Sequence, residues 1–250
     1  MPSTSIRRAL PRAPRHPYLD LVYCHDVEFV SPHDALAAIG ELRRLRDEGK
    51  IRYVGVSGYP LPVLTSIAKL VLERTGEPLD AVQSYSNFNL QNTTLGHDVT
   101  VNAFRDAKVG VLINASILSM GLLTTHLQHI TKDAGLELED AAIRWAMDSW
   151  ADKGAEFGST QLSLSEETRM GITAIGVTSV DQLDATWKVW EQVKQERRSH
   201  QSDGAVTAAT ETVRKLAEER IWPALGAWKD YTWASPDEHY VPSGPSRPAQ

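Results

Sequence analysis

A histidine and an aspartate end the first apolar run of this sequence. Residues 18–24 are apolar except at Asp20, and His25 and Asp26 follow them directly. An imidazole can orient a substrate oxygen or exchange a proton near neutral pH, which is the chemistry of a histidine at the mouth of a barrel. The alternative is that His25 is a polar residue that only ends a strand. The elements around it decide between the two.

The composition excludes several classes of protein. A chain of 250 residues with 42% hydrophobic residues can form one large domain or two small ones. Its net charge of −6 argues against a nucleic-acid-binding surface, and no apolar run reaches the about 18 residues of a membrane-spanning helix. Cys24 is the only cysteine, so no intrachain disulfide can form and a reducing, cytoplasmic setting is expected. His126 and His129 have no carboxylate or cysteine motif around them, so we expect no metal site.

Residues 1–17 differ from the rest of the chain. They contain four arginines and no acidic residue, which is typical of a mitochondrial presequence. Four prolines in the same stretch would break the amphipathic helix that a presequence needs. We therefore expect a disordered or artefactual start, with mitochondrial targeting as the alternative.

Strand-like and helix-like segments alternate from residue 18 onward. Short β-prone apolar runs predict strands, and apolar residues at helical spacing predict the helices between them. The expected strands are 18–24, 51–58, 79–85, 109–116 and 171–179. The expected helices are 31–50, 61 to about 76, about 94–107, 139–151, 180–198 and about 204–220. Residues 152–170 are expected to be an unpatterned insert, and 231–250 a loose polar tail.

A repeat of about 30 residues, the length of one βα unit, separates the starts of the first four strands. Strands that alternate with helices form a parallel sheet covered by helices, either open and doubly wound or closed as a (β/α)8 barrel. Periodicity alone does not choose between them. Trp187 and Trp190 are expected to pack helix 180–198 against this sheet. Residues 18–230 supply five strands, three fewer than a complete barrel.

Five segments, in order along the chain, resemble the aldo-keto reductases. They are YLDLVYCHDVEF (18–29), LRRLRDEGKIRYVGVSGYPL (42–61), AVQSYSNFNL (81–90), KVGVLINASILSMGLLT (108–124) and ITAIGVTSVDQL (172–183). The letters CHDVEF and the glycine at position 58 are similar to the plant and fungal branch that oxidises aldoses at C1. The likeness covers roughly residues 18–195.

The resemblance implies a (β/α)8 barrel with its active site at the carboxyl ends of the strands. It maps the strands of this chain to the fourth through eighth of that barrel, and the first three are absent. It places His25 where the family's histidine orients the substrate oxygen. The expected fold class is therefore α/β, a partial (β/α)8 TIM barrel.

The same resemblance implies a catalytic tyrosine activated by a lysine that an aspartate holds. These three residues belong to the second and third strands of the family barrel, to which no segment of this sequence corresponds. Tyr23 lies on the fourth strand and Lys50 ends a helix on the wrong side of the barrel, so neither replaces them. We expect a chain that is incomplete for catalysis.

The resemblance also implies a nicotinamide cofactor. The residues that match its contacts with the carboxamide and the pyrophosphate are Ser57, Gln83, Ser116, Leu118 and Met120. The alternative for the first two is that they are polar strand ends that bond the backbone. Gly58 stands where the family usually has asparagine, and Ala115 where many members stack an aromatic ring on the nicotinamide.

The segment after the last strand matches the family's contacts with the adenosine end of the cofactor. It places Thr178, Ser179 and Gln182 at the start of helix 180–198, where free N–H groups suit a phosphate. Members that use NADP place a lysine and an arginine here, so NAD is favoured over NADP. The family's Glu-Asn pair in the following helix is replaced by Ala185 and Thr186, which weakens the adenine contacts.

These residues predict an oxidoreductase of the aldo-keto reductase type that oxidises a small-molecule aldose at C1 to its lactone with NAD. No nucleic-acid or membrane partner is expected. The alternative is a catalytically inactive fragment or a non-enzymatic partial barrel. Two partial barrels could also cover each other's edges as a dimer, of which the sequence gives no positive sign.

Overall fold

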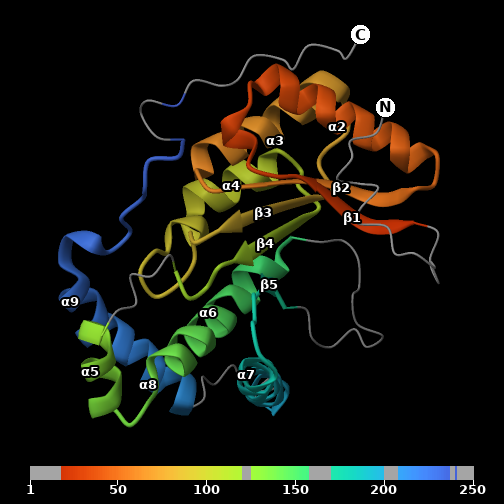
Figure 1. Cartoon of the computed structure of the whole chain (residues 1–250). Coiled ribbons are helices and arrows are strands. Elements are labelled where there is room, and N and C mark those ends of the chain that lie inside the picture. The colour runs from red at the N-terminus through yellow and green to blue at the C-terminus, as the bar shows by residue number, and fades with distance from the viewer. Residues whose placement is uncertain (1–17, 120–124, 158–169, 200–207, 237–239, 241–250) are drawn as a thin grey trace.

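The computed structural model describes residues 18–119, 125–157, 170–199, 208–236 and 240. Its centre is one parallel five-stranded sheet with the strand order β1-β2-β3-β4-β5 (Figure 1). The strands are β1 (Leu19–Cys24), β2 (Ile51–Gly58), β3 (Ala81–Tyr85), β4 (Val111–Ala115) and β5 (Ile172–Ala174). Each strand pairs with the next one in sequence, so all their carboxyl ends lie along one edge.

Helices connect the strands and continue after the last one. They are η1 (Val27–Phe29), α2 (Pro32–Asp47), α3 (Leu61–Thr75), η2 (Thr94–Gly96), α4 (Asp98–Asp106), α5 (Thr125–Asp133), α6 (Leu138–Ala155), α7 (Val180–Ser199), α8 (Ala208–Leu216), η3 (Ala217–Ile221), α9 (Trp222–Leu225) and η4 (Gly226–Trp228). Ser31 caps α2, because its side chain accepts the backbone N–H of Asp34 at 3.1 Å. Gly76, with φ of 72°, ends α3 in the left-handed conformation.

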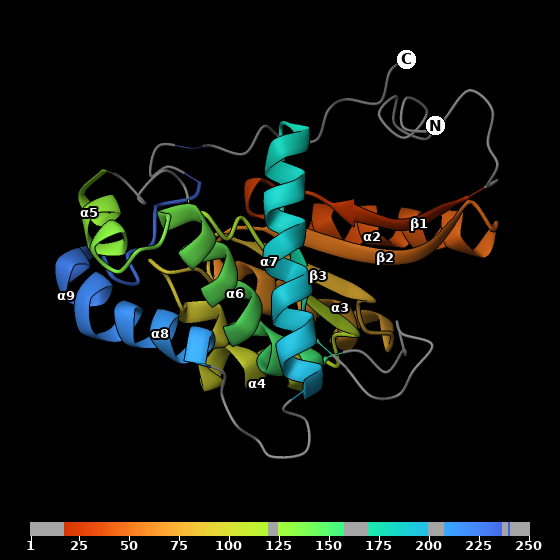
Figure 2. The same cartoon turned by 90° about the horizontal axis from the view of Figure 1, so that it is seen from below.

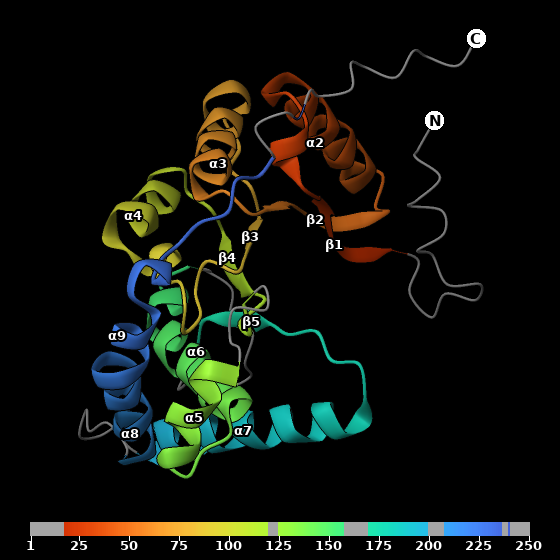
Figure 3. The ribbon, with the colours of Figure 1, turned by 60° about the vertical axis from the view of Figure 1, so that its left-hand side comes forward.

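The core lies between the sheet and its outer helices. Alternate strand residues such as Val56, Val82 and Leu112 are fully buried there, together with Ile39 of α2 and Leu64 of α3. Figure 3 shows the strands as an arc with α2, α3, α4 and α6 along its outer side. Parallel neighbours in sequence order, curved and covered by helices on the outside, are the arrangement of part of a (β/α)8 barrel.

The α/β fold class expected from the sequence is confirmed, and it includes the parallel sheet of five strands. Two bounds differ. The last strand has three residues, whereas the sequence predicted 171–179. Helix α6 continues to Ala155, into the range 152–170 that lacks a periodic pattern. Of the other unpatterned and terminal ranges, 1–17 and 158–169 lie outside the described residues.

Helix α7 departs from the expected packing along its first half. Val193 is fully buried, but Val180 is 71% exposed, Leu183 48% and Trp187 58%. Figure 2 shows the first turns of α7 extending beyond the neighbouring α6. The expectation that Trp187 packs against the sheet is therefore wrong for the described structure, in which the sheet ends at the short β5. Among the described residues, no helix is both long and apolar enough to cross a membrane.

Candidate functional site

The carboxyl-terminal edge of the sheet brings three of the predicted site residues into one row. Ser57 of β2 and Gln83 of β3 are direct cross-strand partners. Cys24 of β1 is paired with Val56, so His25 follows at the level of Ser57. Because paired residues in a parallel sheet point to the same face, Ser57 and Gln83 present their side chains side by side.

The side chains of Ser57 and Gln83 are not paired within the described structure. Within the described part of the chain, neither the Ser57 hydroxyl nor the Gln83 amide has a hydrogen-bond partner. Ser57 is only 2% exposed, although its strand end has backbone groups that it could bond. A hydroxyl can donate and accept, and a primary amide can do both, so the pair fits a ligand carboxamide.

His25 is held by the residue that follows it. Its Nδ1 lies 2.7 Å from Oδ1 of Asp26, and its side chain is 71% exposed. Asp26 has φ of 54°, in the left-handed region that aspartate tolerates better than most residues. With Nδ1 directed to a carboxylate, Nε2 is the ring nitrogen that can face a substrate oxygen.

Three tyrosines lie near this edge, and two of them, Tyr23 and Tyr85, are poorly suited to proton transfer. The rings of Tyr59 and Tyr85 lie 5.3 Å apart. Burial, with the nearby carboxylates of Glu28 and Asp26 adding to it, raises the pKa of Tyr85 to about 12. Burial also raises the pKa of Tyr23 to about 12. A general acid or base works best with a pKa near the working pH, so both phenols are shifted away from that role.

The loop after β4 carries the next predicted contacts. Ser116 is exposed, with φ of 58°, and Leu118 is 36% exposed. Both follow the carboxyl end of β4 directly and therefore lie on the same edge as Ser57 and Gln83. Met120 lies outside the described residues.

The three residues at the start of α7 are exposed and form a helix cap. Ser179 Oγ accepts the backbone N–H of Gln182 at 3.2 Å, and Gln182 Oε1 accepts the backbone N–H of Thr178 at 2.8 Å. These bonds resemble a capping box, which is a sufficient structural reason for the three residue types. These residues still lie at the start of α7, which follows β5, and a helix start is a place where a phosphate can bind.

The segment after α9 holds the loop after β3 and the turn after β1, a role that no sequence motif indicates. Gln91 Nε2 donates to the carbonyl of Trp228 at 2.6 Å, and Asp230 Oδ1 accepts the backbone N–H of Thr93 at 2.6 Å. Further along, the Tyr240 hydroxyl donates to the carbonyl of Phe29 at 2.7 Å. The described residues of this segment thus bond to the loop after β3 and to η1.

A parallel sheet of repeated βα units with polar side chains along the carboxyl ends of its strands is the arrangement of the (β/α)-barrel enzymes. The chain belongs to the aldo/keto reductase family, whose family model matches residues 3–205. It is similar to an aldo/keto reductase from Brucella melitensis of known crystal structure, with a TM-score of 0.50 and 14% identity over 80% of this chain and 61% of that one. This likeness is one of fold alone.

Two curated relatives are sugar dehydrogenases. D-arabinose 1-dehydrogenase of Saccharomyces cerevisiae is 37% identical over 181 residues, which are 71% of this chain and 53% of that protein. L-galactose dehydrogenase of Arabidopsis thaliana is 27% identical over 209 residues, 83% of this chain and 62% of that protein. The chain therefore spans between half and two thirds of the length of these relatives.

Proposed function

We propose that this chain carries the cofactor-binding and substrate-orienting part of an NAD-dependent aldose 1-dehydrogenase. The observation that carries the proposal is the row formed by His25, Ser57 and Gln83 at one edge of a parallel sheet. Ser57 and Gln83 would hold the carboxamide of the nicotinamide, and Nε2 of His25 would accept the hydrogen of the sugar's C1 hydroxyl. The bound nicotinamide supplies the hydride acceptor, and the product is the lactone.

Further contacts in this proposal lie after the carboxyl ends of β4 and β5. Ser116 and Leu118 would approach the pyrophosphate. Met120, which lies outside the described residues, is proposed for the pyrophosphate from the resemblance alone. The start of α7 with Thr178, Ser179 and Gln182 would receive the adenosine end. None of the last three carries a positive charge, so a 2′-phosphate has no cation to pair with there and NAD is preferred. We place this activity in the cytoplasm, with an aldose as the small-molecule substrate.

The residue that removes the proton of the C1 hydroxyl is the missing part of this proposal. The likeness assigns the tyrosine, lysine and aspartate of the family to strands that precede the fourth, and Tyr23 and Tyr85 hold their protons to a pKa of about 12. The 250-residue chain therefore binds the cofactor without efficient turnover. An inactive partial barrel is the second candidate, and the exposed first half of α7 favours it.

Two measurements on the purified chain test the proposal. NADH binding is followed by the fluorescence of the reduced nicotinamide, and turnover by absorbance at 340 nm with NAD and D-arabinose or L-galactose. We expect saturable NADH binding and no turnover. Turnover by this chain alone would show that a residue present here, near His25, accepts the proton. If NADH does not bind, the dehydrogenase proposal fails and the inactive partial barrel remains.

A further inference from the structure

Glu28 is a buried carboxylate beside the candidate site. It lies in η1, three residues after His25, and is 7% exposed. Its Oε1 accepts the backbone N–H of Tyr59 at 3.0 Å. Tyr59 comes two residues after Ser57, so one carboxylate joins the turn that follows β1 to the end of β2.

The second oxygen of this carboxylate faces Gly58. Oε2 of Glu28 is buried and has no hydrogen-bond partner in the described part of the chain. A Cβ at position 58 would lie 2.3 Å from Oε2 and 3.4 Å from Cδ2 of Leu64. The carboxylate cannot move aside without losing the N–H of Tyr59 that it holds through Oε1. Glu28 therefore takes the space that the asparagine usual at position 58 would need.

The C-terminal segment reaches the same carboxylate. The hydroxyl of Ser235 lies 3.5 Å from Oε1 of Glu28, and the hydroxyl of Tyr59 accepts the backbone N–H of Trp233 at 2.9 Å. In Figure 1 the segment after α9 runs along the side of the molecule toward which β3 and β4 point. Three stretches of chain that are far apart in sequence meet at one side chain.

Stability alone does not favour this arrangement. A carboxylate withdrawn from water loses its hydration, and an acceptor oxygen left without a donor receives nothing in exchange. Folded proteins keep a buried oxygen without a hydrogen-bond donor mainly where a functional site needs a fixed geometry. Glu28 lies beside His25 and Ser57, which are the residues whose relative placement the site depends on.

We propose that Glu28 is a positioning residue that fixes His25 relative to Ser57 by tying together the turn after β1, the end of β2 and the C-terminal segment. The inference rests on the proposed function, because that function makes the placement of His25 and Ser57 matter. Gly58 is part of the same arrangement, because a side chain at position 58 would displace the Glu28 carboxylate.

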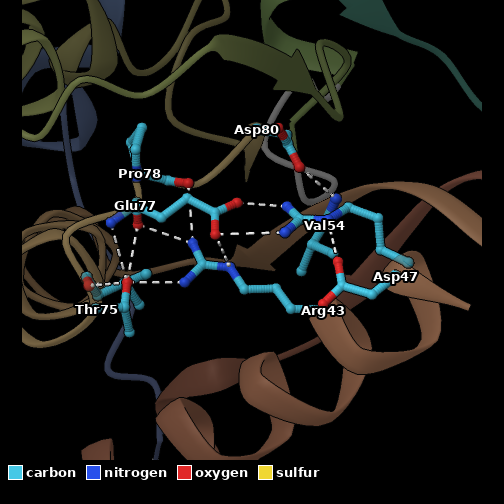
Figure 4. Close-up of polar contacts among 9 residues, drawn as sticks. Arg43, Asp47, Val54, Thr75, Glu77, Pro78 and Asp80 are labelled. Carbon is cyan, nitrogen blue, oxygen red and sulfur yellow. Dashed lines mark hydrogen bonds and ion pairs between the residues drawn. The ribbon is translucent and has the colours of Figure 1, made fainter.

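The first test needs no ligand and compares Glu28→Ala with a matched control by hydrogen–deuterium exchange. Asp80 offers the control, because its Oδ2 accepts a backbone N–H of the same strand, that of Val54 at 2.8 Å, at the opposite end of the sheet (Figure 4). Glu28→Ala should raise exchange in 22–30, 55–62 and 228–236 together. Asp80→Ala should raise it around Val54 only. Exchange confined to the end of β2 in Glu28→Ala would overturn the proposal.

The second test measures NADH affinity. Glu28→Ala should weaken binding by about tenfold, while Glu28→Gln, which keeps the acceptor for the Tyr59 N–H, should stay within about threefold of the parent. Gly58→Ala should act like Glu28→Ala, and the double variant should bind about as well as either single variant, because both changes break the same contact. Asp80→Ala should leave the affinity unchanged.

The two tests separate the failure of each proposal. If the parent chain does not bind NADH, the proposed function fails, and the exchange pattern alone decides the role of Glu28. If the parent binds NADH but Glu28→Ala binds equally well, or if Asp80→Ala weakens binding as much, Glu28 is a structural residue and the positioning proposal is wrong.

Discussion

Nδ1 of His25 lies 2.7 Å from Oδ1 of Asp26, the next residue in the chain. Adjacent residues in a strand point to opposite faces, so this contact requires the strand to have ended. The left-handed conformation of Asp26, with φ of 54°, provides that change of direction. A carboxylate this close to Nδ1 favours the tautomer of the neutral ring that carries the proton on Nδ1.

The first prediction concerns this tautomer. In the parent chain at neutral-ring pH, the ¹⁵N shifts of His25 should show a protonated Nδ1 and an unprotonated Nε2. Asp26→Asn keeps an acceptor oxygen and should keep that tautomer. Asp26→Ala removes the acceptor and should give mainly the Nε2–H form, with a loss of stability of about 1 kcal/mol from the left-handed backbone. The same tautomer in both variants would show that Asp26 does not control the ring.

The second prediction concerns the pair on β2 and β3. Ser57→Ala and Gln83→Ala should each weaken NADH binding by about tenfold, which corresponds to about 1.4 kcal/mol. Ser84→Ala is the control, because Ser84 is the next residue of β3 and its hydroxyl accepts from Asn87 Nδ2 at 2.8 Å instead of facing the edge row. That variant should lose stability but keep its affinity. Equal losses of affinity in all three would mean a general loosening of the sheet.

The family resemblance selects Ser57 and Gln83 as site residues, and the repeat of βα units explains why they are neighbours. Each lies near the carboxyl end of a short apolar run, and parallel strands in sequence order bring such ends to one edge. The location of His25 follows from the same rule. Their shared place at one edge follows from local periodicity and the order of the connections, whereas their choice as site residues came from the resemblance.

Other features depend on contacts that no local pattern contains. The bonds of Glu28 join it to residues 31 and 207 positions further along the chain. A single acidic residue in CHDVEF gives no sign of those partners. Trp187 shows a second feature that sequence cannot predict. Helical spacing indicates which face of a helix is apolar, but not whether another element covers that face.

The third prediction concerns the choice between NAD and NADP. Gln182→Arg places a cation at the start of α7, where a 2′-phosphate would lie, and should raise NADP affinity by about tenfold or more. Gln192→Arg adds the same charge to the exposed surface of the same helix, nearly three turns further on, and should change NADP affinity little. Increased salt should reduce the gain in the first variant. If both variants gain equally, the effect is one of net charge and the adenosine end does not lie at Gln182.

The fourth prediction concerns the opposite end of the sheet, where polar contacts hold α2 to the turn before β3. Arg43 donates to the carbonyls of Glu77 and Pro78 at 2.8 and 3.0 Å, and Arg46 bonds the Glu77 carboxylate (Figure 4). The hydrogen bond from Arg46 holds the pKa of Glu77 below its ordinary value. A lowered pKa in the folded state means stability that is complete above the ordinary value, about 4.3, and is lost as the pH falls through the lower folded value.

Glu77→Gln should therefore lower the free energy of unfolding at pH 7 by less than about 1 kcal/mol, because the Glu77 side chain is 44% exposed and water screens the pair. The difference between parent and variant should shrink as the pH falls below the ordinary value and vanish below the folded one. Urea unfolding at a series of pH values measures it. Glu73→Gln on α3, an exposed residue whose nearest ion contact is 3.8 Å from Lys69, controls for the loss of one negative charge. Parent and Glu77→Gln curves that stay parallel down to the lowest pH would show that the Arg46 contact contributes nothing to the folded state.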